Sequence, residues 1–257
     1  MTLSYVISGF AVGILVGLTG VGGGSLMTPL LALLFGIPPT VAVGTDLAFA
    51  SITKAAGTAA HRYRGTVHWH VVRLLCLGAV PAALIATLGL KHFGALDNSI
   101  SHIIRYSIAC SVLLTVVALL FRGRMLAWVQ RHPDRQLQGG TLALATVFCG
   151  LLLGTLVTIS SIGAGAIGAT LLVLLYPRLT PAEIAGTDIA YAVPLTAIAA
   201  VGHWWLGSLN WALLGMLLIG SVPGITLGSL AARAIPEKFL RGLLAFTLTT
   251  VAYKLIF

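Results

Sequence analysis

Three charged residues lie within long apolar stretches of the chain, and their types suit ion binding. Lys54 is the one cation deep inside such a stretch, where a charge costs about 2.5–3.5 kcal/mol at the centre of a membrane helix. Asp46 precedes it by eight positions, roughly 12 Å along a helix axis, so we expect no direct pair within that helix. We expect Lys54 to pair with Asp188 or with a bound anion.

The two acidic residues occur in matching sequence contexts. Asp46 and Asp188 each follow a Gly-Thr pair, which makes Thr45 and Thr187 candidates for the same site. Each carboxylate either hydrogen-bonds the backbone of a broken helix or binds substrate or a proton. The sequence leaves both interpretations open.

Two glycine-rich clusters interrupt apolar segments, at 19–25 and at 160–165. Flanking pieces of about 14–16 residues are short for a bilayer crossing, which needs about 20, so they indicate helices broken inside the membrane. Free backbone N–H groups and the positive end of the next helix favour an anion, whereas close helix packing is the alternative. The candidate binding residues here are Gly22, Gly23, Gly24, Ser25, Thr28, Ser161, Gly163 and Gly165.

Two histidines near segment ends are weaker candidates. His61 and His203 lie close to tryptophans at 69, 204, 205 and 211, which favours packing at the membrane interface over ligand binding. We keep both as candidate binding residues. The three cysteines, Cys76, Cys110 and Cys149, show no metal spacing and are interpreted as small core residues.

The elements that position these residues follow from composition. Of 257 residues, 58% are apolar and 8% are charged, and the mean hydropathy is +1.03, which excludes an ordinary soluble domain. The chain is predicted to be an all-α integral membrane protein. The net charge of +9 is interpreted as membrane topology, not as a nucleic-acid surface.

Ten apolar segments are separated by glycine, proline and charge clusters. A polar linker at 122–138 divides them into a first repeat at 1–121 and a second repeat at 139–257, with five segments each. The predicted segments are 4–19, 23–36, 41–61, 68–91, 102–121, 140–158, 164–177, 182–204, 210–232 and 238–257.

The two halves resemble each other at an offset of 142 positions. This shift superposes the Gly-Thr-Asp triplets, His61 on His203, Gly65 on Gly207 and Pro81 on Pro223, which indicates an internal duplication. Five segments per half and the placement of basic loops predict inverted repeats. The linker is then cytoplasmic and both termini are outside. Re-entrant hairpins would preserve this parity, so 8–10 transmembrane or re-entrant helices are expected.

No enzyme signature accompanies these features. The chain has no zinc-spaced His cluster, no GxSxG and no Walker A motif, so we expect no metal, no cofactor and no catalytic residue. An intramembrane hydrolase or transferase is the minor alternative. Inverted repeats around broken helices are instead typical of transporters that open alternately to either side.

The segments 17–31 and 42–61, with 162–192, resemble the TauE/SafE family of bacterial membrane permeases over essentially the whole chain. The resemblance implies export of sulfite or an organosulfonate from the cytoplasm across the bacterial inner membrane. It also implies that the glycine motifs line the path, although GAGAIG at 163–168 departs from a glycine triplet. A proton- or cation-coupled transporter of another small anion is the alternative. Expected partners are a small anion and lipid, with a homodimer left open.

Overall fold

The protein is described by a computed structural model. It covers residues 2–19, 24–93, 98–131 and 137–231, together with Gly242, Phe246, 248–250 and Tyr253. These parts of the chain contain helices and no strands, which confirms the predicted all-α class.

Nine helices are defined in the described residues. Five of them, α4, α5, α6, α8 and α9, are long and apolar enough to cross a membrane. The helices are α1 (Thr2–Thr19), α2 (Gly24–Leu34), α3 (Pro39–Tyr63), α4 (Trp69–His92), α5 (Asn98–Arg131), α6 (Gly139–Ser160), α7 (Ala166–Leu175), α8 (Pro181–Trp205) and α9 (Trp211–Ala231).

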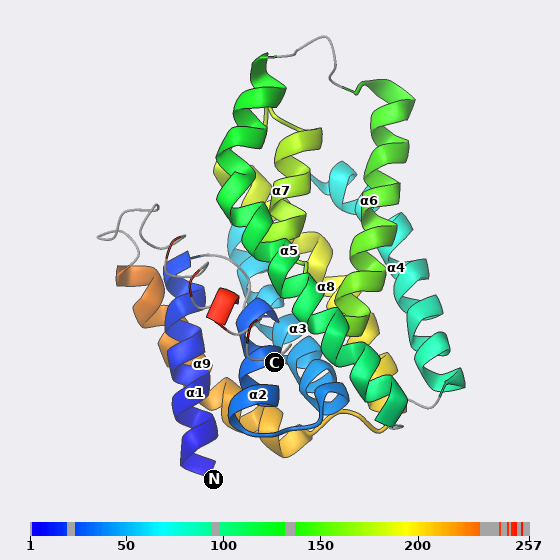
Figure 1. Cartoon of the computed structure of the whole chain (residues 1–257). Coiled ribbons are helices and arrows are strands. Elements are labelled where there is room, and N and C mark those ends of the chain that lie inside the picture. Colours follow the sequence, from blue (N-terminus) through cyan, green and yellow to red (C-terminus); the bar gives the residue numbers. More distant parts are fainter. Residues whose placement is uncertain are drawn as a thin grey trace.

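The helices pack in pairs taken from opposite halves of the chain. Helix α1 packs against α9, α4 packs against α6, and α3 packs against α8. Figure 1 shows the α1–α9 pair on one side of the bundle and the α4–α6 pair on the other, with α3 and α8 between them. The two halves are therefore interleaved, not separate lobes.

Glycines allow the outer pairs to approach closely. A Cβ on Gly220 of α9 would collide with the Val6 carbonyl of α1, and a Cβ on Gly150 of α6 would collide with the Leu75 carbonyl of α4. Backbone contact through small residues is how membrane helices associate without a hydrophobic driving force between them. These helix pairs hold the central α3 and α8 in place.

The helix boundaries follow the 142-residue offset. Helices α3 and α8 begin at Pro39 and Pro181 and have 25 residues each, while α2 and α7 begin at Gly24 and Ala166. The α8 start is fixed by a capping box, in which Thr180 and Glu183 exchange hydrogen bonds and Pro181 occupies the first turn. Matching elements therefore occupy matching positions in the two halves.

The structure differs from the sequence prediction at the linker. Residues 122–131 continue α5 as helix, whereas a loop was expected over 122–138. This stretch has polar residues among good helix formers such as Met125, Leu126 and Ala127, so polarity marks an exit from the apolar layer and not a helix end. The tenth predicted segment, 238–257, falls almost entirely outside the described residues.

Candidate functional site

Lys54 lies in the interior of the bundle. Its side chain is only 6% exposed, and its ammonium nitrogen donates a hydrogen bond to the carbonyl oxygen of Ala164 at 2.7 Å. Lys54 belongs to α3 in the first half, whereas Ala164 lies between α6 and α7 in the second. The cation therefore joins the two halves of the chain at a helix break.

The break between α6 and α7 is a short irregular segment at 161–165. Ser161 caps α6 in the left-handed region at φ 59°, and Gly163 and Gly165 have φ of 131° and 142°, which other residues rarely adopt. Helix α7 then has only 10 residues, about 15 Å, or roughly half of the hydrocarbon layer. The predicted helix break is thus present in this half.

The start of α7 points its positive end at this segment. Gly165 precedes the helix, and within the described chain no side chain caps its first turn. Helix N-termini with available N–H groups favour negative charge. The ammonium of Lys54 is bound to the carbonyl of Ala164, the residue before Gly165, and adds a second positive charge near the helix start.

Asp46 is held by side chains from two other elements. Thr28 of α2 donates a hydrogen bond to Oδ2 of Asp46 at 2.6 Å, and the Ser161 hydroxyl lies beside the same carboxyl without meeting hydrogen-bond geometry. Oδ1 of Asp46 and the Ser161 hydroxyl oxygen are buried and have no hydrogen-bond partner among the described residues. Among the described residues, Oδ2 of Asp46 therefore has a hydrogen-bond donor and Oδ1 has none.

Asp188 occupies the matching position in α8 but has a different environment. Asp188 is 3% exposed, and its Oδ1 atom has no hydrogen-bond partner in the described part of the chain. Thr170, the counterpart of Thr28, donates instead to the Ala166 carbonyl of its own helix at 2.7 Å. The two Gly-Thr-Asp triplets are thus identical in sequence, but their carboxyls differ in hydrogen bonding.

The predicted pairing of Lys54 with Asp188 is not a direct ion pair. Among the described residues neither Asp46 nor Asp188 comes within 4.0 Å of the ammonium nitrogen, although both carboxyls are close enough to interact with it electrostatically. The Ala164 carbonyl takes the ammonium because the helix break leaves that carbonyl without a helical donor. Lys54 therefore interacts with both acids electrostatically and forms a direct ion pair with neither.

Thr45 and Thr187 join the halves through their hydroxyl oxygens. Thr187 accepts a hydrogen bond from the His68 N–H at 3.0 Å, and Thr45 accepts one from the Asn210 N–H at 3.1 Å. The two bonds are related by the 142-residue offset, and each runs from one half to the other. Such reciprocal contacts are what a two-fold relationship between the halves generates.

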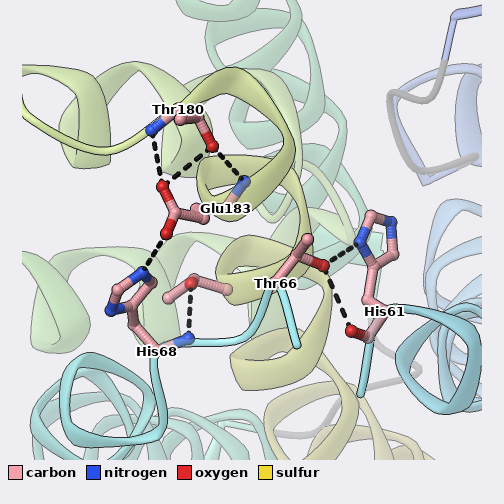
Figure 2. Close-up of polar contacts among 6 residues, drawn as sticks. His61, Thr66, His68, Thr180 and Glu183 are labelled. Atoms are coloured by element: carbon pink, nitrogen blue, oxygen red, sulfur yellow. Dashed lines mark hydrogen bonds and ion pairs between the residues drawn. The ribbon is translucent and has the colours of Figure 1, made fainter. Parts of the chain in front are cut away.

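The two histidines lie at the ends of their helices and do not join the cluster around Lys54. His61 contacts the Thr66 hydroxyl through Nδ1 at 2.8 Å, as Figure 2 shows, and His203 contacts Ser208 in the same way at 3.1 Å. His203 also contacts the Thr158 carbonyl through Nε2 at 2.9 Å. Both imidazoles stabilise the turns that follow α3 and α8.

The first glycine cluster is only partly visible. Gly22 and Gly23 lie outside the described residues, and Gly24 and Ser25 open α2 with nothing described of the Ser25 side chain. Tyr191 was not predicted: it is fully buried in α8, with its hydroxyl unpartnered within the described chain. Its counterpart at the 142-residue offset is Phe49, and this mismatch between otherwise similar halves was the available signal.

No group of three His, Cys, Asp or Glu side chains that could hold a metal occurs in the residues described. The site therefore consists of one ammonium, two carboxyls and a helix break, all inside a bundle of apolar helices. These features define a multi-pass helical membrane protein with an internal charged site.

Comparison with known proteins identifies the family. Residues 5–255 match the family described as "Sulfite exporter TauE/SafE". The chain is therefore a member of the TauE/SafE family. The chain is 37% identical to the "Probable membrane transporter protein YjnA" of Bacillus subtilis (strain 168) over 259 residues, which cover 100% of both chains.

More distant relatives carry similar names. The chain is 27% identical to the "Probable membrane transporter protein YdhB" of Bacillus subtilis (strain 168), over 96% of this chain and 97% of the relative. It is 29% identical to a "Probable membrane transporter protein" of Xylella fastidiosa (strain Temecula1 / ATCC 700964), over 88% of this chain and 82% of the relative. No solved structure matches the chain.

Proposed function

We propose that this protein is a permease that exports a small sulfur-containing anion, sulfite or an organosulfonate, from the cytoplasm by alternating access. The observation that carries the proposal is the buried Lys54 ammonium on the Ala164 carbonyl at the α6–α7 break. Membership of the sulfite exporter family indicates the class of substrate. The relatives named as probable membrane transporters support transport over catalysis.

The ammonium of Lys54 has capacity to bind a ligand. A lysine ammonium has three N–H donors, and within the described part of the chain one of them has an acceptor, the Ala164 carbonyl. The two remaining donors and the start of α7 suit the oxygens of a sulfite or sulfonate group. A buried cation that lacks a close carboxylate is more favourable when an anion is bound beside it.

Reciprocal contacts between the halves support alternating access. In this structure the bond from His68 to Thr187 and the bond from Asn210 to Thr45 are both present. If the halves are inverted, as the sequence predicts, these bonds lie toward opposite membrane faces. Opening to either side then requires that one of the two bonds separates while the other persists.

The membrane potential favours the proposed direction. A potential that is negative inside drives an anion outward by about 2.3 kcal/mol per charge per 100 mV. We also propose that the protein lies in the bacterial inner membrane, with both termini outside and the linker in the cytoplasm. Export of an anion under these conditions needs no further source of energy.

The proposal is tested with purified protein in liposomes loaded with sulfite or a small alkanesulfonate. Under an imposed inside-negative potential, efflux of at least one of these anions is expected to exceed efflux from protein-free liposomes. Collapse of the potential should slow the efflux of sulfite, which is a dianion. Equal efflux with and without protein, for every sulfur anion tried, would contradict the proposal.

A second candidate is a proton- or cation-coupled transporter of another small anion. It is favoured by the Oδ1 atoms of Asp46 and Asp188, which have no hydrogen-bond partner among the described residues and are acceptors when ionised. Thermal stabilisation of the purified protein separates the two candidates, because a ligand raises the unfolding temperature of the state that it binds. Stabilisation by sulfite or sulfonates supports export of sulfur anions, and stabilisation by sodium alone supports the second candidate.

A further inference from the structure

The Asp188 carboxyl and the Tyr191 hydroxyl fill the space over Gly168 in the second half of the chain, and we call this small polar group the Gly168 pocket. A Cβ on Gly168 would collide with Oδ1 of Asp188 and would come within 3.0 Å of the Tyr191 hydroxyl. Both oxygens therefore face the same point, and both are buried without a hydrogen-bond partner in the described chain. Buried polar groups without partners are rare and call for an explanation.

The first half does not contain this pocket. At the 142-residue offset, Leu26 stands in place of Gly168 and Phe49 in place of Tyr191, and both are buried. The Asp46 carboxyl is instead bound by Thr28 at 2.6 Å. At these matched positions only the second half has a glycine and a tyrosine hydroxyl near its carboxyl.

We propose that Asp188 carries an exchangeable proton and that Tyr191 positions it. When ionised, Oδ1 can accept a hydrogen bond from the Tyr191 hydroxyl; when protonated, the carboxyl can donate to the Tyr191 oxygen. Because residue 168 is glycine, the Asp188 carboxyl can occupy space that a side chain there would fill, close to the Tyr191 hydroxyl. The proton comes from water on one side and returns to water on the other, with no oxidation or reduction.

Other ionisable groups surround this pocket from several helices. Lys54 of α3 and Arg122 of α5 act on the Asp188 carboxyl, while Cys76 of α4 and Cys149 of α6 lie near the Tyr191 hydroxyl. Asp46, also on α3, shares the electrostatic environment of Lys54. Protonation of Asp188 removes one negative charge near Lys54 and so strengthens the attraction of Lys54 for an anion.

This coupling rests on the proposed function, because it predicts that proton and anion bind together and move in the same direction. Sulfite, a dianion, then still carries one net negative charge outward, so the membrane potential still favours its export. In liposomes, an inside-acid pH gradient should accelerate anion efflux several-fold in the wild type. Asp188→Asn, which cannot release a proton, should transport without dependence on the gradient or not at all. Efflux by Asp188→Asn with the same dependence on the gradient as the wild type would overturn the coupling.

The proton itself is tested without any substrate, by infrared spectroscopy of the purified protein across a pH titration. A protonated carboxyl has a carbonyl stretch that an ionised carboxylate lacks. We expect this pH-dependent band in the wild type and in Asp46→Asn, and its loss in Asp188→Asn. A band that persists unchanged in Asp188→Asn would overturn the assignment, whatever the outcome of the transport assay.

Tyr191→Phe and Gly168→Ala keep the test decisive if Asp188→Asn does not fold. Tyr191→Phe removes one hydroxyl from the pocket and restores the residue of the first half, so the fold should persist while the band shifts in frequency. Gly168→Ala should also shift it by occupying the pocket. An unshifted band in both variants would overturn the proposal. The proposal would also be overturned if the wild type lacked the band and were stabilised by sodium chloride but not by choline chloride.

Discussion

Lys54 donates a hydrogen bond to the Ala164 carbonyl at 2.7 Å, so a cation of the first half satisfies a backbone oxygen of the second. Inside a bilayer, backbone groups freed by a helix break must find a partner within the protein. Lys54 supplies that partner. In the function that we propose, the same ammonium also binds the anion.

The hydrogen bond from Thr28 to Asp46 is predicted to matter more than its counterpart at Thr170. Thr28→Val leaves both oxygens of a buried carboxyl short of a donor, a loss of about 1–3 kcal/mol, and should lower the thermal unfolding midpoint. Thr170→Val removes only a bond to the Ala166 carbonyl of the same helix. Equal shifts in the two variants, measured on purified protein, would contradict this difference between the carboxyls.

Close backbone approach at Gly186 is predicted to be required for the fold. A Cβ there would lie 2.6 Å from the Thr66 carbonyl, so Gly186→Ala should destabilise the protein by about 1–3 kcal/mol through overpacking. Gly89→Ala is the matched control, because none of the described residues lies within 4 Å of a Cβ at that helical position. Its thermal midpoint should be equal to or above that of the wild type. A Gly186→Ala protein as stable as Gly89→Ala would show that the contact between α8 and the turn after α3 can relax.

Two contacts of His68 are predicted to differ in strength. Its side chain pairs with Glu183 at 2.9 Å (Figure 2), but the two side chains are 40% and 29% exposed, so His68→Asn should cost less than about 1 kcal/mol. Thr187→Val removes the buried acceptor of the His68 N–H and should cost about 1–3 kcal/mol. Chemical or thermal unfolding of the two variants gives the comparison, and a larger effect of His68→Asn would reverse this ranking.

Much of the helical architecture could be predicted from the sequence. The glycines at 163 and 165 indicated the α6–α7 break, because positive φ angles favour glycine. Composition and hydropathy predicted a multi-pass helical protein. The expected end of this helix at 121 followed the change from apolar to polar residues, whereas the stop signal in the sequence is Pro133, two positions after Arg131.

The site was less predictable than the fold. Lys54, Asp46 and Asp188 were recognisable because charges are rare in apolar segments. The hydrogen-bond partner of Lys54 could not be recognised from the sequence, because any residue supplies a backbone carbonyl. Tyr191 resembles any aromatic core residue until its hydroxyl is seen beside Asp188 and Gly168. The predicted roles of the glycine cluster at 22–24, and of His61 and His203 in binding, remain predictions.

The most direct test is anion efflux from liposomes that contain Lys54→Met, with Lys91→Met as the matched control. Lys91 is exposed and its ammonium lies 3.4 Å from the centre of the Trp205 ring, away from the internal site. We predict that Lys54→Met remains folded in the membrane and loses efflux to the level of protein-free liposomes, while Lys91→Met transports like the wild type. Wild-type efflux by folded Lys54→Met would contradict the role of this lysine in anion binding.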